Sequence, residues 1–125
     1  MTHSVLVVED EPNIVLSLKF VLKQAGFSVR VAEDGAQAIE EIERDAPDAV
    51  LLDIMLPKRD GFSVCETIRA NPAWSAIKII VLSARSREAD KEKALAVGTD
   101  DFITKPFSTR DLGDRVKGLI AADSG

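Results

Sequence analysis

The sequence predicts an α/β fold, a doubly wound (βα)5 sandwich in which helices cover both faces of a five-stranded parallel sheet. Short apolar runs alternate along the 125-residue chain with longer amphipathic stretches, which is typical of repeated βα units. The runs at 5–8, 49–52 and 79–82 are continuously apolar, as central parallel strands buried on both faces are. The runs at 28–31 and 102–104 are shorter and mixed, which favours the edges of the sheet.

The amphipathic stretches show helical spacing and recognisable ends. Pro12 suits a first helical turn, and Gly26 suits the left-handed residue that follows a helix. Ser108 and Asp111 have the spacing of a capping box, so Ser108 is expected to cap the last helix. The expected helices cover about 12–25, 35–45, 61–70, 88–97 and a last stretch that begins near 108.

The order of the strands follows from their connections. Right-handed crossovers allow few arrangements, and the order 2-1-3-4-5 places both mixed strands at edges. This is the order of flavodoxin-like folds, in which strands one and three are neighbours where ligands bind. Each strand ends in polar residues, so the carboxyl edge of the sheet is expected to gather Glu9, Asp10, Asp53, Ser83 and Lys105.

Such a cluster of charges predicts a metal-assisted reaction. Three carboxylates within several ångströms repel one another by a few kcal/mol per pair, so either one is protonated or a cation lies among them. Mg²⁺ takes one or two carboxylates, keeps waters and recruits phosphate oxygens. A metal beside a free carboxylate favours transfer of a phosphoryl group onto that carboxylate. Lys105 and Ser83 would then contact the phosphoryl oxygens.

Composition limits the class of protein. The length suits one domain, residues 1–125, with 121–125 expected to be a flexible tail or the start of a linker. The net charge of −5 argues against direct nucleic-acid binding by this domain. No apolar run is long enough to span a membrane, and the N-terminus lacks the pattern of a signal peptide. The single cysteine, Cys65, suits a reducing compartment, so we expect a cytoplasmic protein without a membrane association.

The motifs together resemble the receiver domain of two-component response regulators over nearly the whole chain. Each is weak alone, and their order and spacing carry the resemblance. They are Val8-Glu9-Asp10-Glu11, Leu52-Asp53 with Pro57 and Asp60-Gly61 after it, Ser83-Ala84, and Asp101-Phe102 followed by Lys105-Pro106-Phe107.

The resemblance implies a phosphorylation-dependent signalling switch. Asp53 would accept a phosphoryl group from a phosphohistidine on a sensor histidine kinase or phosphotransfer protein. Asp10 and Asp53 would bind Mg²⁺ directly, the backbone carbonyl of Met55 would add a ligand, and Glu9 would act directly or through water. Such a domain is not an enzyme on an external substrate, because it catalyses only its own phosphotransfer and dephosphorylation.

The resemblance also implies the residues of the switch. Lys105 and Ser83 match the phosphate-contacting lysine and switch hydroxyl, and the Lys105-Pro106 bond resembles the cis peptide of the family. Phe102 stands at the aromatic switch position, where tyrosine is frequent. Its ring can still be buried when the switch moves, but it has no hydroxyl to form a hydrogen bond. Glu9 stands where a second aspartate is more frequent, and its longer arm is expected to change metal affinity.

The output surface is expected on the fourth helix, fifth strand and fifth helix. Its charged residues Lys91, Asp101, Asp111 and Arg115 resemble those of receivers that form two-fold dimers through this face in DNA-binding regulators. A homodimer formed on phosphorylation is therefore one expectation, with Lys91 meeting Asp111 and Asp101 meeting Arg115 across or near the interface. The alternative is that these are solvated charges of little energetic weight.

Three other functions fit parts of the pattern. A haloacid-dehalogenase-like hydrolase needs a second acid two residues after its aspartyl nucleophile, where this chain has Met55. A flavodoxin-like module that binds flavin or phosphate needs a Gly/Ser/Thr-rich loop after the first strand, where this chain has Glu9 to Pro12. A degenerate receiver would act only as a protein-binding module, and the complete set of acceptor, acids, hydroxyl and lysine argues against it.

Overall fold

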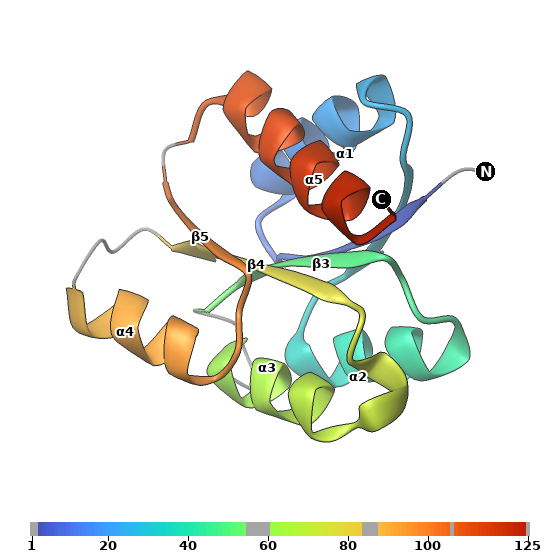
Figure 1. The fold of residues 1–125 in the computed structure, drawn as a ribbon. Helices are drawn as coiled ribbons and strands as arrows, with labels where there is room; N and C mark the ends of the chain where they lie inside the picture. The colour runs from blue at the N-terminus through green and yellow to red at the C-terminus, as the bar shows by residue number, and fades with distance from the viewer. Residues whose placement is uncertain (1–2, 55–60, 84–87, 106, 125) are drawn as a thin grey trace.

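Five strands and five helices alternate along the chain, as the sequence predicts. The computed structural model describes residues 3–54, 61–83, 88–105 and 107–124, with side chains as far as residue 121. The alternation is visible in Figure 1. The elements are β1 Ser4–Val8, α1 Pro12–Gln24, β2 Ser28–Ala32, α2 Gly35–Arg44, β3 Ala49–Asp53, α3 Gly61–Ala70, the 3-10 helix η1 Pro72–Trp74, β4 Lys78–Ser83, α4 Glu88–Ala96, β5 Asp101–Thr104 and α5 Thr109–Ser124.

The strands form one parallel sheet in the order β2-β1-β3-β4-β5, which confirms the predicted order. In the register of β1, Val5 lies opposite Val29 of β2 on one side and Ala49 of β3 on the other. The mixed strands β2 and β5 are the two edges. All five strands run in the same direction, so their carboxyl ends meet at one edge of the sheet.

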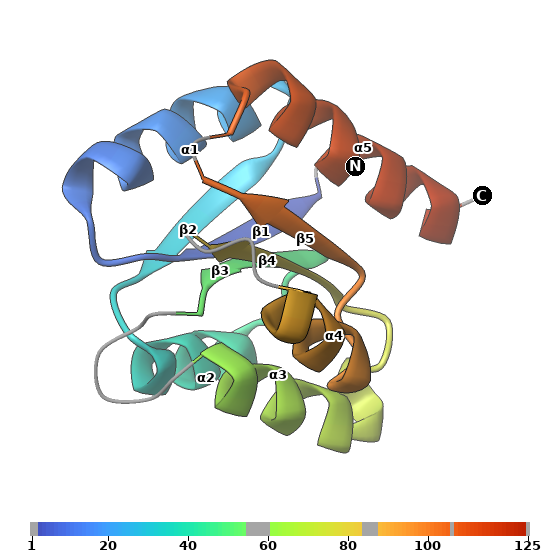
Figure 2. The ribbon, with the colours of Figure 1, turned by 90° about the vertical axis from the view of Figure 1, so that its left-hand side faces the viewer.

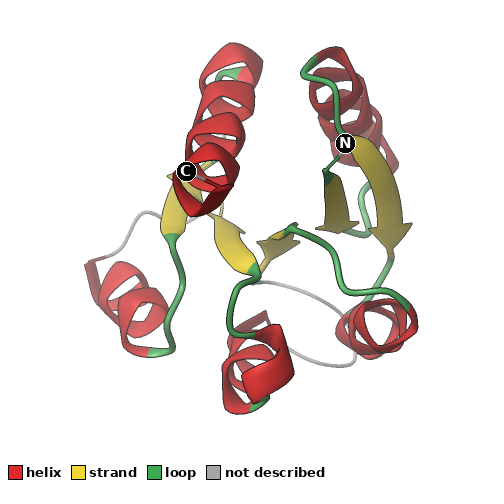
Figure 3. Ribbon diagram, turned by 45° about the vertical axis from the view of Figure 1, so that its right-hand side comes forward, coloured by secondary structure: helices red, strands yellow, loops and turns green. Residues whose placement is uncertain are grey.

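Helices cover both faces of the sheet and enclose two apolar cores. Helices α1 and α5 lie on one face, and α2, α3 and α4 lie on the other (Figures 1 and 2; Figure 3 shows the same layers by element type). Leu18 of α1 and Leu112 of α5 are fully buried in the first core, whereas Ile42 of α2 and Cys65 of α3 are buried in the second. Burial of each such aliphatic side chain is worth roughly 1.5–3 kcal/mol.

The ends of the helices follow local capping. Gly26, at φ +94°, turns the chain after α1 in a conformation that L side chains rarely adopt. The Asp34 side chain accepts a hydrogen bond from the Gln37 amide at 2.9 Å and so caps α2. At the start of α5, Ser108 Oγ accepts from the Asp111 amide at 3.3 Å, as the capping-box spacing predicts.

Helix α5 continues to Ser124, so most of the stretch expected to be a flexible tail or the start of a linker is helical. Ile120 is buried in the core that α1 and α5 cover, and this contact holds the helix as far as its last turns. The two alanines that follow have the highest helix propensity of any residue, so the backbone hydrogen bonds continue. In the part of the chain that the structure describes, no helix has both the length and the apolar character needed to cross a membrane.

Candidate functional site

The carboxyl edge of the sheet places four polar residues side by side. Asp53 and Ser83 are the last residues of β3 and β4, and Glu9 and Lys105 directly follow β1 and β5. The Lys105 amide donates a 2.6 Å hydrogen bond to the Ser83 carbonyl, which extends the pairing of β4 and β5 by one residue. The sheet order therefore determines which side chains meet, although they lie far apart in sequence.

Lys105 joins two carboxylates in a cluster that we term the site triad, composed of Glu9, Asp53 and Lys105. The Lys105 ammonium donates to Asp53 Oδ2 at 2.8 Å and to Glu9 Oε2 at 3.0 Å. The other oxygen of Glu9, Oε1, accepts from the Glu11 amide at 3.3 Å. The Glu9 side chain is 1% exposed and that of Lys105 is 14% exposed, so the triad lies almost entirely out of water.

Burial and the neighbouring charges shift two pKa values in the triad. Burial raises the pKa of Glu9, and the nearby Asp53 charge raises it further, although the Lys105 ammonium opposes both. Burial alone would lower the pKa of Lys105, but hydrogen bonds from its ammonium to Asp53 and Glu9 outweigh burial and raise it. Lys105 is therefore a cation at neutral pH, and the triad holds two acids and one base.

Gly61 packs against the backbone that carries Asp53. A Cβ atom at Gly61 would lie 2.6 Å from the Ile54 Cα and 2.9 Å from the Asp53 carbonyl oxygen, far inside van der Waals contact. The Gly61 amide also donates to the Ile54 carbonyl at 3.2 Å. The sequence places Gly61 in a motif without showing this role. Only the fold brings the first turn of α3 against the end of β3.

Asp10 and Met55 were the other predicted metal ligands. Asp10 is exposed, although it directly follows the buried Glu9. Met55 lies outside the described residues. Among the residues that the structure does describe, no three His, Cys, Asp or Glu side chains are close enough to hold a metal ion. Of the three expected carboxylates, Glu9 and Asp53 are brought together by their contacts with Lys105.

The donor chemistry of the site still fits Mg²⁺. Carboxylate oxygens are the hard ligands that this ion prefers, and it needs only one or two of them. Glu9 and Asp53 place two carboxyl groups on the single ammonium of Lys105, so the buried site has one more acidic group than it has cations. Asp10, the residue after Glu9, is exposed to solvent.

The predicted output residues surround a hollow that is formed by α4, β5 and α5. Lys91, Phe102, Asp111 and Arg115 line this hollow of about 340 Å³. Phe102 is half-buried and packs against the core that α3 covers. The Arg115 guanidinium contacts Asp101 Oδ1 at 3.3 Å and Asp111 Oδ2 at 3.1 Å. The Asp101–Arg115 pair expected at an interface is therefore already made within one chain.

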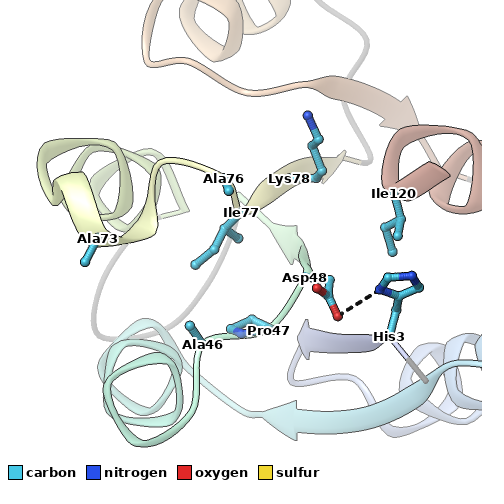
Figure 4. Close-up of a pocket in the computed structure, with 9 residues that line it drawn as sticks. All are labelled: His3, Ala46, Pro47, Asp48, Ala73, Ala76, Ile77, Lys78 and Ile120. Carbon is cyan, nitrogen blue, oxygen red and sulfur yellow. Dashed lines mark ion pairs between the residues drawn. The ribbon is translucent and has the colours of Figure 1, made fainter. Parts of the chain in front are cut away.

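Another hollow, of about 170 Å³, lies at the opposite edge of the sheet. His3 Nδ1 lies 3.4 Å from Asp48 Oδ2, and Figure 4 shows this pair beside Ile120 of α5. His3 and Asp48 precede β1 and β3, and Lys78 begins β4, so these residues mark the amino ends of the strands. The hollow is therefore separated from the site triad by the length of the sheet, and the sequence indicates nothing about it.

Comparison with known proteins identifies the family to which this fold belongs. The family model of the response regulator receiver domain matches residues 5–117. The chain belongs to this family. It is 41% identical over 120 residues to the alkaline phosphatase synthesis transcriptional regulatory protein PhoP of Bacillus subtilis, covering 96% of this chain and 49% of PhoP. The chain thus spans about half the length of this curated relative.

Solved structures of receivers share the fold. A response regulator receiver domain protein from Methanospirillum hungatei superposes with a TM-score of 0.92 at 25% identity, covering 99% of this chain and 98% of that one. A second structure is the receiver domain of the sensor histidine kinase PA1611 from Pseudomonas aeruginosa, solved with a magnesium ion in its active-site cleft. It superposes with a TM-score of 0.88 at 33% identity, covering 97% of this chain and 99% of that one. Receiver domains are signalling domains of two-component systems that interact with sensor histidine kinases.

Proposed function

We propose that this receiver is a phosphorylation switch in which Asp53 accepts a phosphoryl group from a phosphohistidine. The observation that carries the proposal is the 2.8 Å contact between the Lys105 ammonium and Asp53 Oδ2. Asp53 ends a fully buried strand, at a sheet edge that also carries Glu9 and Ser83. A buried carboxylate beside a fixed cation is oriented for attack and ready for the charge that a phosphoryl group brings.

The transfer follows from these positions. An Asp53 carboxylate oxygen attacks phosphorus, an O–P bond forms and the P–N bond to the donor imidazole breaks, and the imidazole nitrogen takes up a proton. The Lys105 ammonium would then pair with a phosphoryl oxygen. The Ser83 hydroxyl would hydrogen-bond to another oxygen, because Ser83 ends the neighbouring strand. Hydrolysis of the acyl phosphate by water resets the switch, so the domain catalyses only its own modification.

Mg²⁺ would be held by Glu9, Asp10, Asp53 and the Met55 backbone carbonyl. When bound, it would neutralise the phosphoryl oxygens during transfer. The donor chemistry of the site supports this assignment, as does the magnesium ion recorded in the active-site cleft of the PA1611 receiver.

The signal would pass to the surface of α4, β5 and α5. Phosphorylation adds about −1.5 to −2 charges at the end of β3. Ser83 and Lys105, joined by a backbone hydrogen bond, would move toward it. Their movement would let the half-buried Phe102 ring turn inward beside the hollow of Lys91 and Arg115. A homodimer through this face is the output that we favour, because its charges can exchange partners across a two-fold axis.

The cellular setting is part of the same proposal. The relative PhoP is named a transcriptional regulatory protein, which favours a DNA-binding effector as the target of the signal. With a net charge of −5, this domain itself would not bind nucleic acid. A sensor histidine kinase or phosphotransfer protein would be its partner in the cytoplasm. The second candidate, a degenerate receiver that only binds proteins, is disfavoured by the intact contact between Lys105 and Asp53.

The test is incubation with acetyl phosphate and Mg²⁺, followed by intact-mass measurement. The wild type should gain the mass of one phosphoryl group, and Asp53→Asn should gain none. Asp48→Asn is the matched control, since Asp48 lies at the opposite edge of the sheet and should leave phosphorylation unchanged. Modification that persists in Asp53→Asn, or that never occurs in the wild type even with Mg²⁺ present, contradicts the proposal. Sedimentation of the beryllofluoride complex separately tests whether the activated protein forms a dimer. If the complex sediments as a monomer at high concentration, the proposed dimer is excluded.

A further inference from the structure

Glu9 makes contacts that a metal ligand alone would not need. Its Oε2 accepts from the Lys105 ammonium at 3.0 Å, and its Oε1 accepts from the Glu11 amide at 3.3 Å. Both oxygens are therefore engaged inside the protein, and the side chain is 1% exposed. A carboxylate held at both oxygens is fixed in orientation, and the group that it orients is the ammonium of Lys105.

We propose that Glu9 is a positioning residue that sets the magnesium affinity of this site by holding Lys105 in it as an internal counter-ion. The inference rests on the proposed function, because it concerns the same magnesium site. Mg²⁺ and the ammonium compete for oxygens of the same two carboxylates, and two cations in one buried site repel each other. Binding of the ion would therefore require that the contact between Glu9 and Lys105 be broken.

The length of the Glu9 side chain is what makes this contact. Glutamate exceeds aspartate by one carbon–carbon bond, about 1.5 Å. Retraction of the carboxylate by that length would turn the 3.0 Å contact into one beyond hydrogen-bonding distance. Lys105 would then keep only Asp53, at 2.8 Å. The carboxylate at position 9 would be available to a metal ion without first losing a charge-assisted hydrogen bond.

The test is calorimetric titration of the unphosphorylated protein with MgCl₂ at constant ionic strength, which measures binding and not phosphorylation. Glu9→Asp should bind Mg²⁺ about tenfold more tightly than the wild type, since one charge-assisted hydrogen bond no longer opposes binding. Lys105→Met should tighten binding by at least as much. Lys117→Met, which removes the same charge from the exposed face of α5, is the matched control and should change the affinity less than twofold.

A double-mutant cycle separates the positioning role from simple ligation. If Glu9 acts through Lys105, the gain from Glu9→Asp should disappear in the Lys105→Met background. A gain of the same size in both backgrounds would show that only the metal ligand had changed, and would overturn the inference. Circular dichroism of each variant checks that it folds, and Lys105→Gln takes the place of Lys105→Met in the cycle if Lys105→Met does not fold.

The outcomes distinguish the inference from the function on which it rests. If all variants bind Mg²⁺ equally and the wild type is phosphorylated on Asp53, the inference fails and the proposed function stands. If neither the wild type nor any variant binds Mg²⁺, both the inference and the metal-assisted function fail. Tighter binding by Glu9→Asp and Lys105→Met supports both, provided that the gain from Glu9→Asp is lost in the Lys105→Met background and that Lys117→Met has no effect.

Discussion

Two triads of charged residues differ in burial and in composition. One is buried and has two acids and one base, whereas the other lies at the surface and has two bases and one acid. The site triad puts two carboxylates, Glu9 and Asp53, on one ammonium. A second cluster, which we term the surface triad, puts two guanidinium groups, Arg30 and Arg44, on the single carboxylate of Glu41. The first lies buried at the carboxyl edge of the sheet, and the second lies between the edge strand β2 and helix α2.

The two triads differ in what their charges do to an acid. Burial raises the pKa of Glu9, and the neighbouring Asp53 adds to the rise. The hydrogen bond from Arg44 lowers the pKa of Glu41, and Arg30 lowers it further. Two guanidinium groups contact Glu41, and they stabilise its charged form in the folded protein. Glu9 and Asp53 share one ammonium, so a second cation such as a metal ion can bind between them. The proposed site therefore coincides with unbalanced charge, and short ion pairs alone do not mark it.

The largest effect is expected when the site triad loses its only cation. Lys105→Met leaves Glu9 and Asp53 buried together without the ammonium, which should lower the free energy of unfolding at pH 7 by about 2 kcal/mol. Uptake of a proton by one carboxylate keeps the loss below the upper range for buried pairs. Urea denaturation in EDTA measures it, and saturating Mg²⁺ should restore part of it. Equal loss with and without Mg²⁺ would show that the ion does not replace the ammonium.

Loss of a cation from the surface triad should matter less, and for a different reason. Arg30 donates to the Glu41 carbonyl at 3.1 Å and also to the Asp45 carbonyl, so it caps the end of α2. Arg30→Met should cost about 1–2 kcal/mol through these lost hydrogen bonds. Urea denaturation at pH 7 measures the change, and Mg²⁺ should not reduce it. A rescue by Mg²⁺ would remove the distinction between the two triads.

The fold and much of the site could be predicted from the sequence because the relevant signals are local. Apolar runs and capping residues mark the elements, and strand order then places Asp53, Ser83 and Lys105 at one edge. The contact between Glu9 and Lys105 could not be predicted, because 96 positions separate them and the length of one side chain decides it. The close approach of Gly61 to Ile54 depends likewise on packing between α3 and β3.

The continuation of α5 to Ser124 was missed for a related reason. Local composition after Ile120 resembles a linker, but burial of Ile120 against the sheet extends the helix. Asp10 is exposed beside the buried Glu9, a difference that the motif does not show. Tertiary packing therefore decides what local composition cannot.

The inverted triads predict opposite signs for one conservative substitution. Glu9→Gln, measured in EDTA, should raise the free energy of unfolding at pH 7 by about 1 kcal/mol or less, because it removes the surplus buried charge. The pKa of Glu9 is raised in the folded protein. The wild type therefore loses stability as pH rises from 4.5, the ordinary pKa of glutamate, through the raised pKa. The advantage of glutamine should therefore appear over that window and vanish below it. A destabilised Glu9→Gln variant at pH 7 would contradict the idea that the site holds excess charge.

Glu41→Gln is the matched change in the surface triad and should give the smallest effect, with the reverse sign. The lowered pKa of Glu41 means that its charge stabilises the fold above the ordinary value of 4.5, and that this contribution is lost as pH falls through the lowered pKa. The glutamine variant should therefore be slightly less stable at pH 7 and equal to the wild type only below the lowered pKa, where the glutamate is protonated. Solvent and salt screen this triad, so 1 M NaCl should shrink the difference. If Glu9→Gln and Glu41→Gln changed stability with the same sign at pH 7, the balance of charge would not be what distinguishes the two triads.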